Sequence, residues 1–216
     1  MVTLAVETKR GKVRQSMSKP NDPFDWSGGH PALDFVNTLD ERSFETPIEN
    51  LATYRDLVRF TELAGLIPRP KAKPLRDAVG AESTRVAKQA LRLREQLHRI
   101  LAAQHVGRQA SQVDLDAIGK AILAAHAARE IVVPGALGIA EYAWKTSSGI
   151  DVPLHACSLA IERLLLDVDR HRIRKCEALD CHVYFIDTSK GHRRQWCSMR
   201  NCGNREKQRR WRSGKE

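Results

Sequence analysis

Hydrophobic residues recur at three- and four-residue steps in four parts of the chain, and this period predicts amphipathic helices. The four segments lie near 51–64, 82–106, 112–128 and 152–172. Asn50 is a plausible N-cap for the first segment, and Ser111 with Asp114 resembles a capping box for the third. Gly65 and Gly107 are expected to end the first and second helices.

The same period predicts which side chains face the core. The inward positions are Leu51, Tyr54, Leu57 and Val58; Val86, Ala90, Leu93, Leu97 and Ile100; Leu115, Ile118, Ile122 and Ala125; and Leu154, Cys157, Ile161, Leu164 and Val168. Cys157 is therefore expected to act as a small buried hydrophobe, without a redox or ligand role.

Shorter segments carry weaker signals. Residues 130–149 favour a hairpin or two short strands, with Pro134-Gly135 as the turn. PALDFVNTL is compatible with a strand or a short helix, and RPKAKP (69–74) is expected to form a loop. Together these elements predict an α+β protein: a mostly helical N-terminal domain with a β-hairpin, and a small C-terminal module.

Composition narrows the protein class. A hydrophobic share of 42% allows a packed core, and no apolar run approaches the ~20 residues of a membrane span. The polar residues 1–24 predict a disordered lead without a secretory signal, and Met17 is an alternative start. We therefore expect a cytoplasmic protein with no membrane partner and with reduced thiols.

The net charge of +10 is concentrated at one end of the chain. Residues 170–216 carry fourteen Lys or Arg and five Asp or Glu, a net of +9, and residues 1–169 carry the remaining +1. This distribution favours a polyanionic partner, with DNA first and RNA second, over a merely solubilising tail.

Four of the five cysteines, Cys176, Cys181, Cys197 and Cys202, form the pattern C-x4-C-x15-C-x4-C. In a reducing compartment, two close pairs separated by a short loop indicate a tetrahedral zinc site. Four thiolates complete the coordination shell, so the expected cofactor is one structural Zn2+ and not a catalytic one. A module of this size buries too little apolar surface to fold alone, and metal binding supplies the missing energy.

Around these ligands the pattern predicts a treble-clef-like finger over residues 170–216. HVYFI (182–186) is expected as a strand, RRQW (193–196) as the returning strand, and Cys202-Gly203 as the start of a basic helix. Trp196 and Trp211 are expected to pack its small core. The predicted nucleic-acid contacts are Arg193, Arg194, Arg205, Lys207, Arg209, Arg210 and Arg212.

The finger resembles a known family, the CGNR zinc finger, named for the run found here as Cys202-Gly203-Asn204-Arg205. The matching residues are Cys176, Cys181, Phe185, Asp187, Ser189, Arg194, Trp196, Cys197, Ser198, Met199, Cys202, Gly203, Asn204 and Arg205. The segment GGHPALDFVNTLDER (Gly28 to Arg42) similarly resembles the start of ABATE, the partner domain in that family. The resemblance covers about 25–212.

The resemblance implies a stress-related transcription regulator, in which residues 25–169 sense a ligand or dimerise and residues 170–216 bind DNA. The polar residues proposed for a small-molecule pocket are His30, Asp34, Asn37, Thr38 and Arg42, with internal capping and pairing as the alternative. An RNA-binding or ribosome-associated zinc protein and a protein-interaction finger are the other hypotheses. The sequence has no familiar catalytic motif, so we expect no enzyme.

Overall fold

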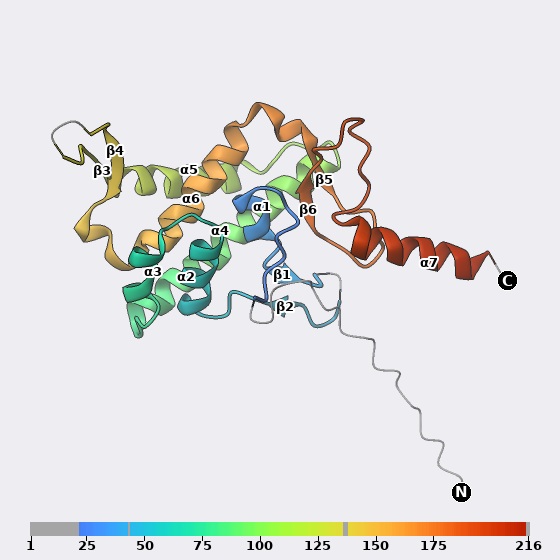
Figure 1. Cartoon of the computed structure of the whole chain (residues 1–216), viewed down its shortest axis with the longest axis horizontal. Helices are drawn as coiled ribbons and strands as arrows, with labels where there is room; N and C mark the ends of the chain where they lie inside the picture. The colour runs from blue at the N-terminus through green and yellow to red at the C-terminus, as the bar shows by residue number, and fades with distance from the viewer. Residues whose placement is uncertain (1–21, 43, 136–137, 215–216) are drawn as a thin grey trace, which may run out of the picture.

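A computed structural model describes residues 22–42, 44–135 and 138–214 of the chain (Figure 1). The predicted disordered lead lies almost entirely outside these residues, and so does Met17. The described chain forms a mostly helical body followed by a small finger, from which the last helix projects.

Helices make up most of the described chain, in the body and in the finger. The α-helices are α1 (Pro31–Val36), α2 (Tyr54–Leu63), α3 (Arg69–Leu75), α4 (Ala81–His105), α5 (Gln112–Ala127), α6 (Val152–Leu166) and α7 (Asn204–Ser213). The shorter helical turns are η1 (Thr146–Asp151), η2 (Val168–Arg172) and η3 (Met199–Gly203). The described strands form three two-stranded antiparallel sheets: β1 (Leu39–Asp40) with β2 (Ile48–Glu49), β3 (Arg129–Val132) with β4 (Glu141–Trp144), and β5 (Ile173–Lys175) with β6 (Tyr184–Ile186).

The apolar core of the body is built around α4 and α6. Helix α4 packs against α1, α2, α5 and α6, and α6 also contacts α1 and α2. The predicted stripe Val86, Ala90, Leu93, Leu97 and Ile100 is buried, as the helical period requires. Cys157 is 1% exposed in this core, so its predicted role as a small hydrophobe is confirmed.

Helix α1 resolves the ambiguity over PALDFVNTL. Pro31 stands in the first turn, where its missing N–H costs nothing, and the ring of His30 caps the helix by accepting the N–H of Ala32. Ala32 to Val36 are buried throughout, because α1 lies between α4, α6 and β6. This helix therefore connects the body to the finger.

Local capping differs from the sequence prediction at two helices. The N-cap of helix α2 is Thr53 and not Asn50, because Thr53 and Asp56 form a complete capping box. At α5 the predicted box is wrong, since the Ser111 side chain makes no cap bond and Asp114 instead pairs with Arg99 at 2.5 and 2.9 Å. Leu115, which was expected to face inward, is 38% exposed.

The predicted loop at 69–74 is wrong, because these residues lie in α3. Pro70 falls in the first turn, where no backbone donor is needed, and Pro74 removes only one bond from a seven-residue helix. Formation of α3 buries Ala72 completely beside α2, which stabilises the helix. Packing has therefore outweighed the low helix propensity of two prolines.

The hairpin after α5 is confirmed, and Pro134-Gly135 lies in the connection between its strands. The strands end at Val132 and resume at Glu141, so the connection runs from 133 to 140. The predicted helix 152–172 is also interrupted. The extended Asp167 ends α6, and its carboxylate accepts the N–H of Asp169 to start η2.

Candidate metal centre and basic surface

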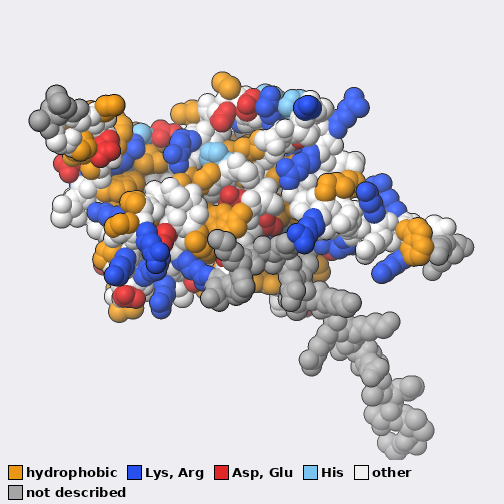
Figure 2. Space-filling view, viewed as in Figure 1, with side chains coloured by type: hydrophobic (Ala, Val, Ile, Leu, Met, Phe, Trp, Pro, Cys, Tyr) orange, Lys and Arg blue, Asp and Glu red, His pale blue; other side chains and the backbone are white. Residues whose placement is uncertain are grey.

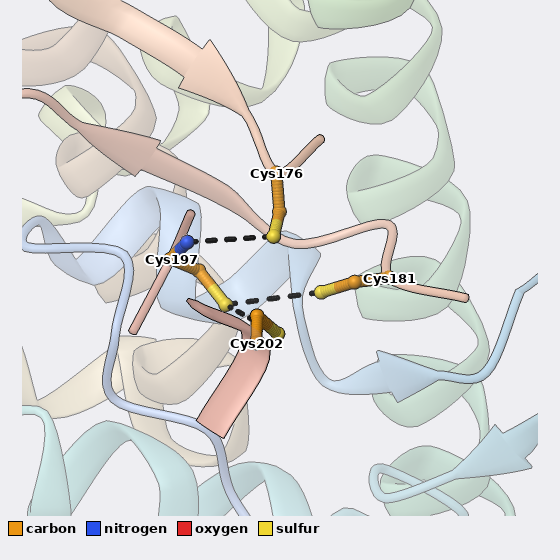
Figure 3. A group of neighbouring side chains, drawn as sticks. All are labelled: Cys176, Cys181, Cys197 and Cys202. Carbon is orange, nitrogen blue, oxygen red and sulfur yellow. Dashed lines mark hydrogen bonds between the residues drawn. The ribbon is translucent and has the colours of Figure 1, made fainter. Parts of the chain in front are cut away.

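The four predicted ligand cysteines meet at one buried point of the finger (Figure 3). Their sulfur atoms all lie within 4.8 Å of one another, with Cys181–Cys197 at 3.8 Å and Cys197–Cys202 at 3.5 Å. Zn–S bonds of about 2.3 Å in a tetrahedron place the sulfurs about 3.8 Å apart. The separations fit four thiolates around a single zinc ion, and they are too long for disulfides.

Short local structures deliver the four thiols. Cys176 follows β5 directly, and the tight loop that starts there ends at Cys181, whose N–H reaches the carbonyl of Ala178. Cys202 lies in η3, which is capped by the side chain of Ser198 and runs into α7. The ion therefore fixes the start of α7 relative to the β5–β6 hairpin.

Hydrogen bonds to sulfur support the thiolate state. The backbone N–H of Cys197 donates to Cys176 Sγ at 3.4 Å, and Arg205 Nη2 donates to Cys202 Sγ at 3.4 Å. Donors that favour the charged sulfur are the chemistry that a zinc site requires.

The Cys-Gly-Asn-Arg run is explained residue by residue around this centre. A Cβ on Gly203 would lie 2.9 Å from Met199 Sδ and 3.2 Å from Trp196 Cε3, so glycine allows the helix start to approach both side chains. The Asn204 amide donates to the carbonyl of Arg200 across this turn. Arg205 pairs with Asp180 at 2.6 Å, which ties α7 to the loop between the first two ligands.

A second group of hydrogen bonds shapes residues 187–197. The fully buried Asp187 carboxylate accepts the N–H groups of Ser189 and Arg194 and the Ser189 hydroxyl, and these bonds, led by the hydroxyl, lower its pKa to about 2. The Arg194 guanidinium donates to the carbonyls of Trp196 and Cys197 and lies 4.5 Å from the Phe185 ring centroid. RRQW is therefore held as a loop, and the prediction that it forms the returning strand is wrong.

The helical body covers the open edge of β6. The Asn37 amide donates to the Tyr184 carbonyl at 2.9 Å, and its oxygen accepts the Tyr184 N–H at 3.0 Å. Two residues on, the N–H of Ile186 donates to the carbonyl of Gly28 at 2.9 Å. Tyr184 is 2% exposed within the main core, so finger and body are docked rather than joined by a free linker.

The five polar residues proposed for a pocket all have internal partners. Besides the contacts of His30 and Asn37, Asp34 accepts the Gly28 N–H at 2.9 Å, and Thr38 donates to the Phe35 carbonyl at 2.7 Å. Arg42 pairs with Glu95 and also donates to the Val36 carbonyl. These contacts are capping, pairing and docking, in line with the alternative that the sequence left open, and the ligand pocket stays a prediction.

The predicted nucleic-acid contacts fall into two groups. Arg194, Arg205 and Arg209 are partly buried and bound within the finger, Arg209 to Glu206 at 2.6 Å. The remaining four are exposed: Arg193, Lys207, Arg210 and Arg212. Arg205, Arg209 and Arg212 also line one hollow along α7, as their shared face predicts. Lys and Arg side chains cover much of the finger in Figure 2, although others lie over the far end of the body.

The two tryptophans of the finger lie in different environments. Trp196 is half-buried against the small core that contains the four cysteines, as predicted. Trp211 is 64% exposed on α7, so the prediction that it packs this core is wrong. It lies in the third turn of α7, which projects from the rest of the finger.

The sequence predictions missed Asp180, Glu49 and Arg94, because their partners are distant in sequence. Asp180 holds Arg205, and Arg94 is 2% exposed yet pairs with Glu49 at 2.6 and 2.7 Å. Two acids, Glu177 and Asp180, lie between the first two ligand cysteines and were a usable signal for a partner of Arg205, although spacing does not choose between them. Arg94 occupied an inward position of the long helix, and a charge on that face predicts a buried partner.

Comparison with known families agrees with these sites. The ABATE family, described as "putative stress-induced transcription regulator", matches residues 29–167, and the CGNR zinc finger family matches residues 172–215. The chain belongs to the ABATE family and carries a CGNR zinc finger that holds one zinc ion through Cys176, Cys181, Cys197 and Cys202. A comparison with curated proteins gives no match. Within the described residues, none of the helices combines the length and apolarity that crossing a membrane requires.

Proposed function

We propose that this chain regulates transcription by binding DNA through the basic surface of its zinc finger, without catalysing a reaction. The observation that supports the proposal is the exposed set of cations on a metal-anchored helix: Lys207, Arg210 and Arg212 on α7, with Arg193 on the preceding loop. Zinc and the Arg205–Asp180 pair hold α7 in place, so these charges form a surface of defined shape.

The arginines of the finger differ in exposure and in internal contacts, and this difference decides which substitutions test DNA binding. Arg194, Arg205 and Arg209 already have partners inside the finger, so substituting them would test its folding as much as its binding. The exposed Arg210 and Arg212 lie in the last turns of α7 and are the cleaner probes. Arginine forks suit DNA phosphates and the O6/N7 edge of guanine.

The first experiment recovers fragments of the source genome on zinc-loaded protein at near-physiological salt and sequences them. A shared motif that disappears after chelation supports a sequence-specific regulator. Uniform recovery of all fragments means that binding lacks specificity, and stronger recovery of structured RNA would favour the RNA-binding alternative.

A second experiment locates the contact. Arg210→Ala with Arg212→Ala should weaken binding and make the slope of log K against log salt shallower by about 1.8, or about 0.9 per lost phosphate contact. The control is Lys88→Ala with Arg92→Ala, which removes two exposed charges from α4. An equal loss in both double variants would remove α7 from the proposal.

A further inference from the structure

A hollow of about 360 Å3 lies where the body meets the finger; its lining includes Lys175, which directly precedes the ligand Cys176, but no zinc ligand and no residue of α7. Its walls come from the end of α4 and the residues just after it, from η2, and from β5. It is therefore made by both families' segments together, and neither could form it alone. Its size falls within the range of small-molecule sites, roughly 300–1,000 Å3.

The walls of the hollow are basic. The positively charged or titratable side chains that line it are His105, Arg108, Arg170, His171, Arg174 and Lys175. No Asp or Glu is among its lining residues. Arg170 donates one N–H to the Leu165 carbonyl, and in the described part of the chain no carboxylate forms an ion pair with Arg108, Arg174 or Lys175. Of these four cations, Lys175 is half-buried and the three arginines are exposed.

The floor of the hollow differs from its walls. Leu101 and Tyr184 are each 2% exposed, and the half-buried Ile173 lies beside them. An apolar floor under a ring of cations suits a ligand with a flat organic part and a strongly anionic part. The carbonyl end of α4 opposes an anion, but its partial charge of about −0.5 is small against four full positive charges.

We propose that this hollow binds a small anion carrying two or more phosphate groups, of the nucleoside diphosphate class. Four cations from three segments around one hollow match several phosphate oxygens better than a single carboxylate or chloride. Such a ligand would bridge α4 to β5 and so add contacts between the body and the finger. This last step rests on the proposed DNA-binding role, and it would make the anion an effector of the finger.

The test titrates zinc-loaded full-length protein with inorganic pyrophosphate by calorimetry. We expect one saturable site per chain and a raised melting temperature, since binding to the folded state stabilises it. Arg108→Ala with Arg174→Ala should weaken binding at least about tenfold, because two charge-assisted contacts are lost. Both side chains are exposed, so an unchanged melting temperature without pyrophosphate will show that the variant folds.

The matched control is again Lys88→Ala with Arg92→Ala, which removes two charges from the other half of α4. Lack of saturable binding, or an equal loss in the control, would overturn the proposal. A DNA backbone is the other source of phosphate, so duplex binding is measured in parallel. Arg108→Ala with Arg174→Ala should change it less than about threefold at physiological salt. A larger loss would make the hollow part of the DNA path instead.

These arms separate the two proposals. If the unmodified protein binds pyrophosphate but no DNA, the anion site stands and the DNA-binding function fails. If it binds DNA but no pyrophosphate, the reverse holds.

Discussion

The helical body and the finger are held together by different forces, although they share a boundary. The body buries a continuous apolar core from α1, α2, α4, α5 and α6. The small finger core consists of only seven buried residues, of which four are the zinc-binding cysteines. Without the metal, four of these seven residues lose their common ligand, and those that stay ionised as thiolates repel one another. Size explains the difference, since a short module cannot bury enough apolar surface to offset its chain entropy.

Metal removal should give the largest effect and expose the contrast most clearly. We expect chelation, or Cys202→Ala, to unfold the finger while α4 to α6 stay folded, because structural zinc contributes about 10–16 kcal/mol to such modules. Hydrogen exchange measured by mass spectrometry should show lost protection at 173–213 only. Cys157→Ala is the control and should keep one zinc per chain by elemental analysis. Equal loss of protection in α4 to α6 would show that the two regions form one cooperative unit.

The docking of β6 should give the next largest effect. Asn37→Ala leaves the buried N–H and C=O of Tyr184 without partners, at about 1–3 kcal/mol each. We expect a lower free energy of unfolding and faster zinc loss to a chelator, although residue 37 is not a zinc ligand. The exposed Asn201 provides the control, and Asn201→Ala should leave both quantities unchanged. Zinc loss at an unaltered rate would mean that the body does not support the finger.

Asp34 makes stability depend on pH in the body. Burial raises its pKa to about 7, despite the N–H bond from Gly28. The folded protein then binds more protons at this site than the unfolded chain between about pH 4 and 7, so its contribution falls as the pH rises through that window. Asp34→Asn should therefore gain stability relative to the unmodified protein up to about pH 7, by about 2–4 kcal/mol, and the difference should level off above it. Chemical denaturation at pH 6, 7 and 8 measures this; a constant difference would contradict the shift.

The smallest effect is expected at Gly203. An alanine Cβ there would contact Met199 and Trp196 too closely, but the methionine end can move, so we expect about 1–2 kcal/mol and a weaker hold on zinc. Gly191→Ala is a matched control in the same finger, because a Cβ at Gly191 meets nothing within 4 Å. Competition with a chromogenic chelator compares the two. Similar zinc affinities would show that the close approach at Gly203 is unimportant.

The sequence predicted what depends on near neighbours. Helical periodicity located α4 within a residue or two at each end, and cysteine spacing identified the zinc ligands, since both signals are local. The treble-clef arrangement stays a prediction. Contacts between distant residues were not predictable: Asn37 and Tyr184 are 147 positions apart, and nothing near Asn37 indicates a strand partner. Helix α3 was missed because burial of Ala72 outweighed its prolines, and the basic hollow because charge counts do not show which segments adjoin.

The covered edge of β6 has a consequence for the newly made chain. The body is synthesised first, but β6 and the ligands that follow it emerge last, so there is an interval before zinc is captured. Without the contacts to Asn37 and Gly28, the backbone of Tyr184 and Ile186 would be open to pairing with another chain during that interval, beside the apolar run Val183-Tyr184-Phe185-Ile186. Such a segment favours aggregation when it is exposed. Asn37 and Gly28 are synthesised before β6 and can cover this edge as soon as β6 docks on the body. This protection would matter most where zinc is scarce.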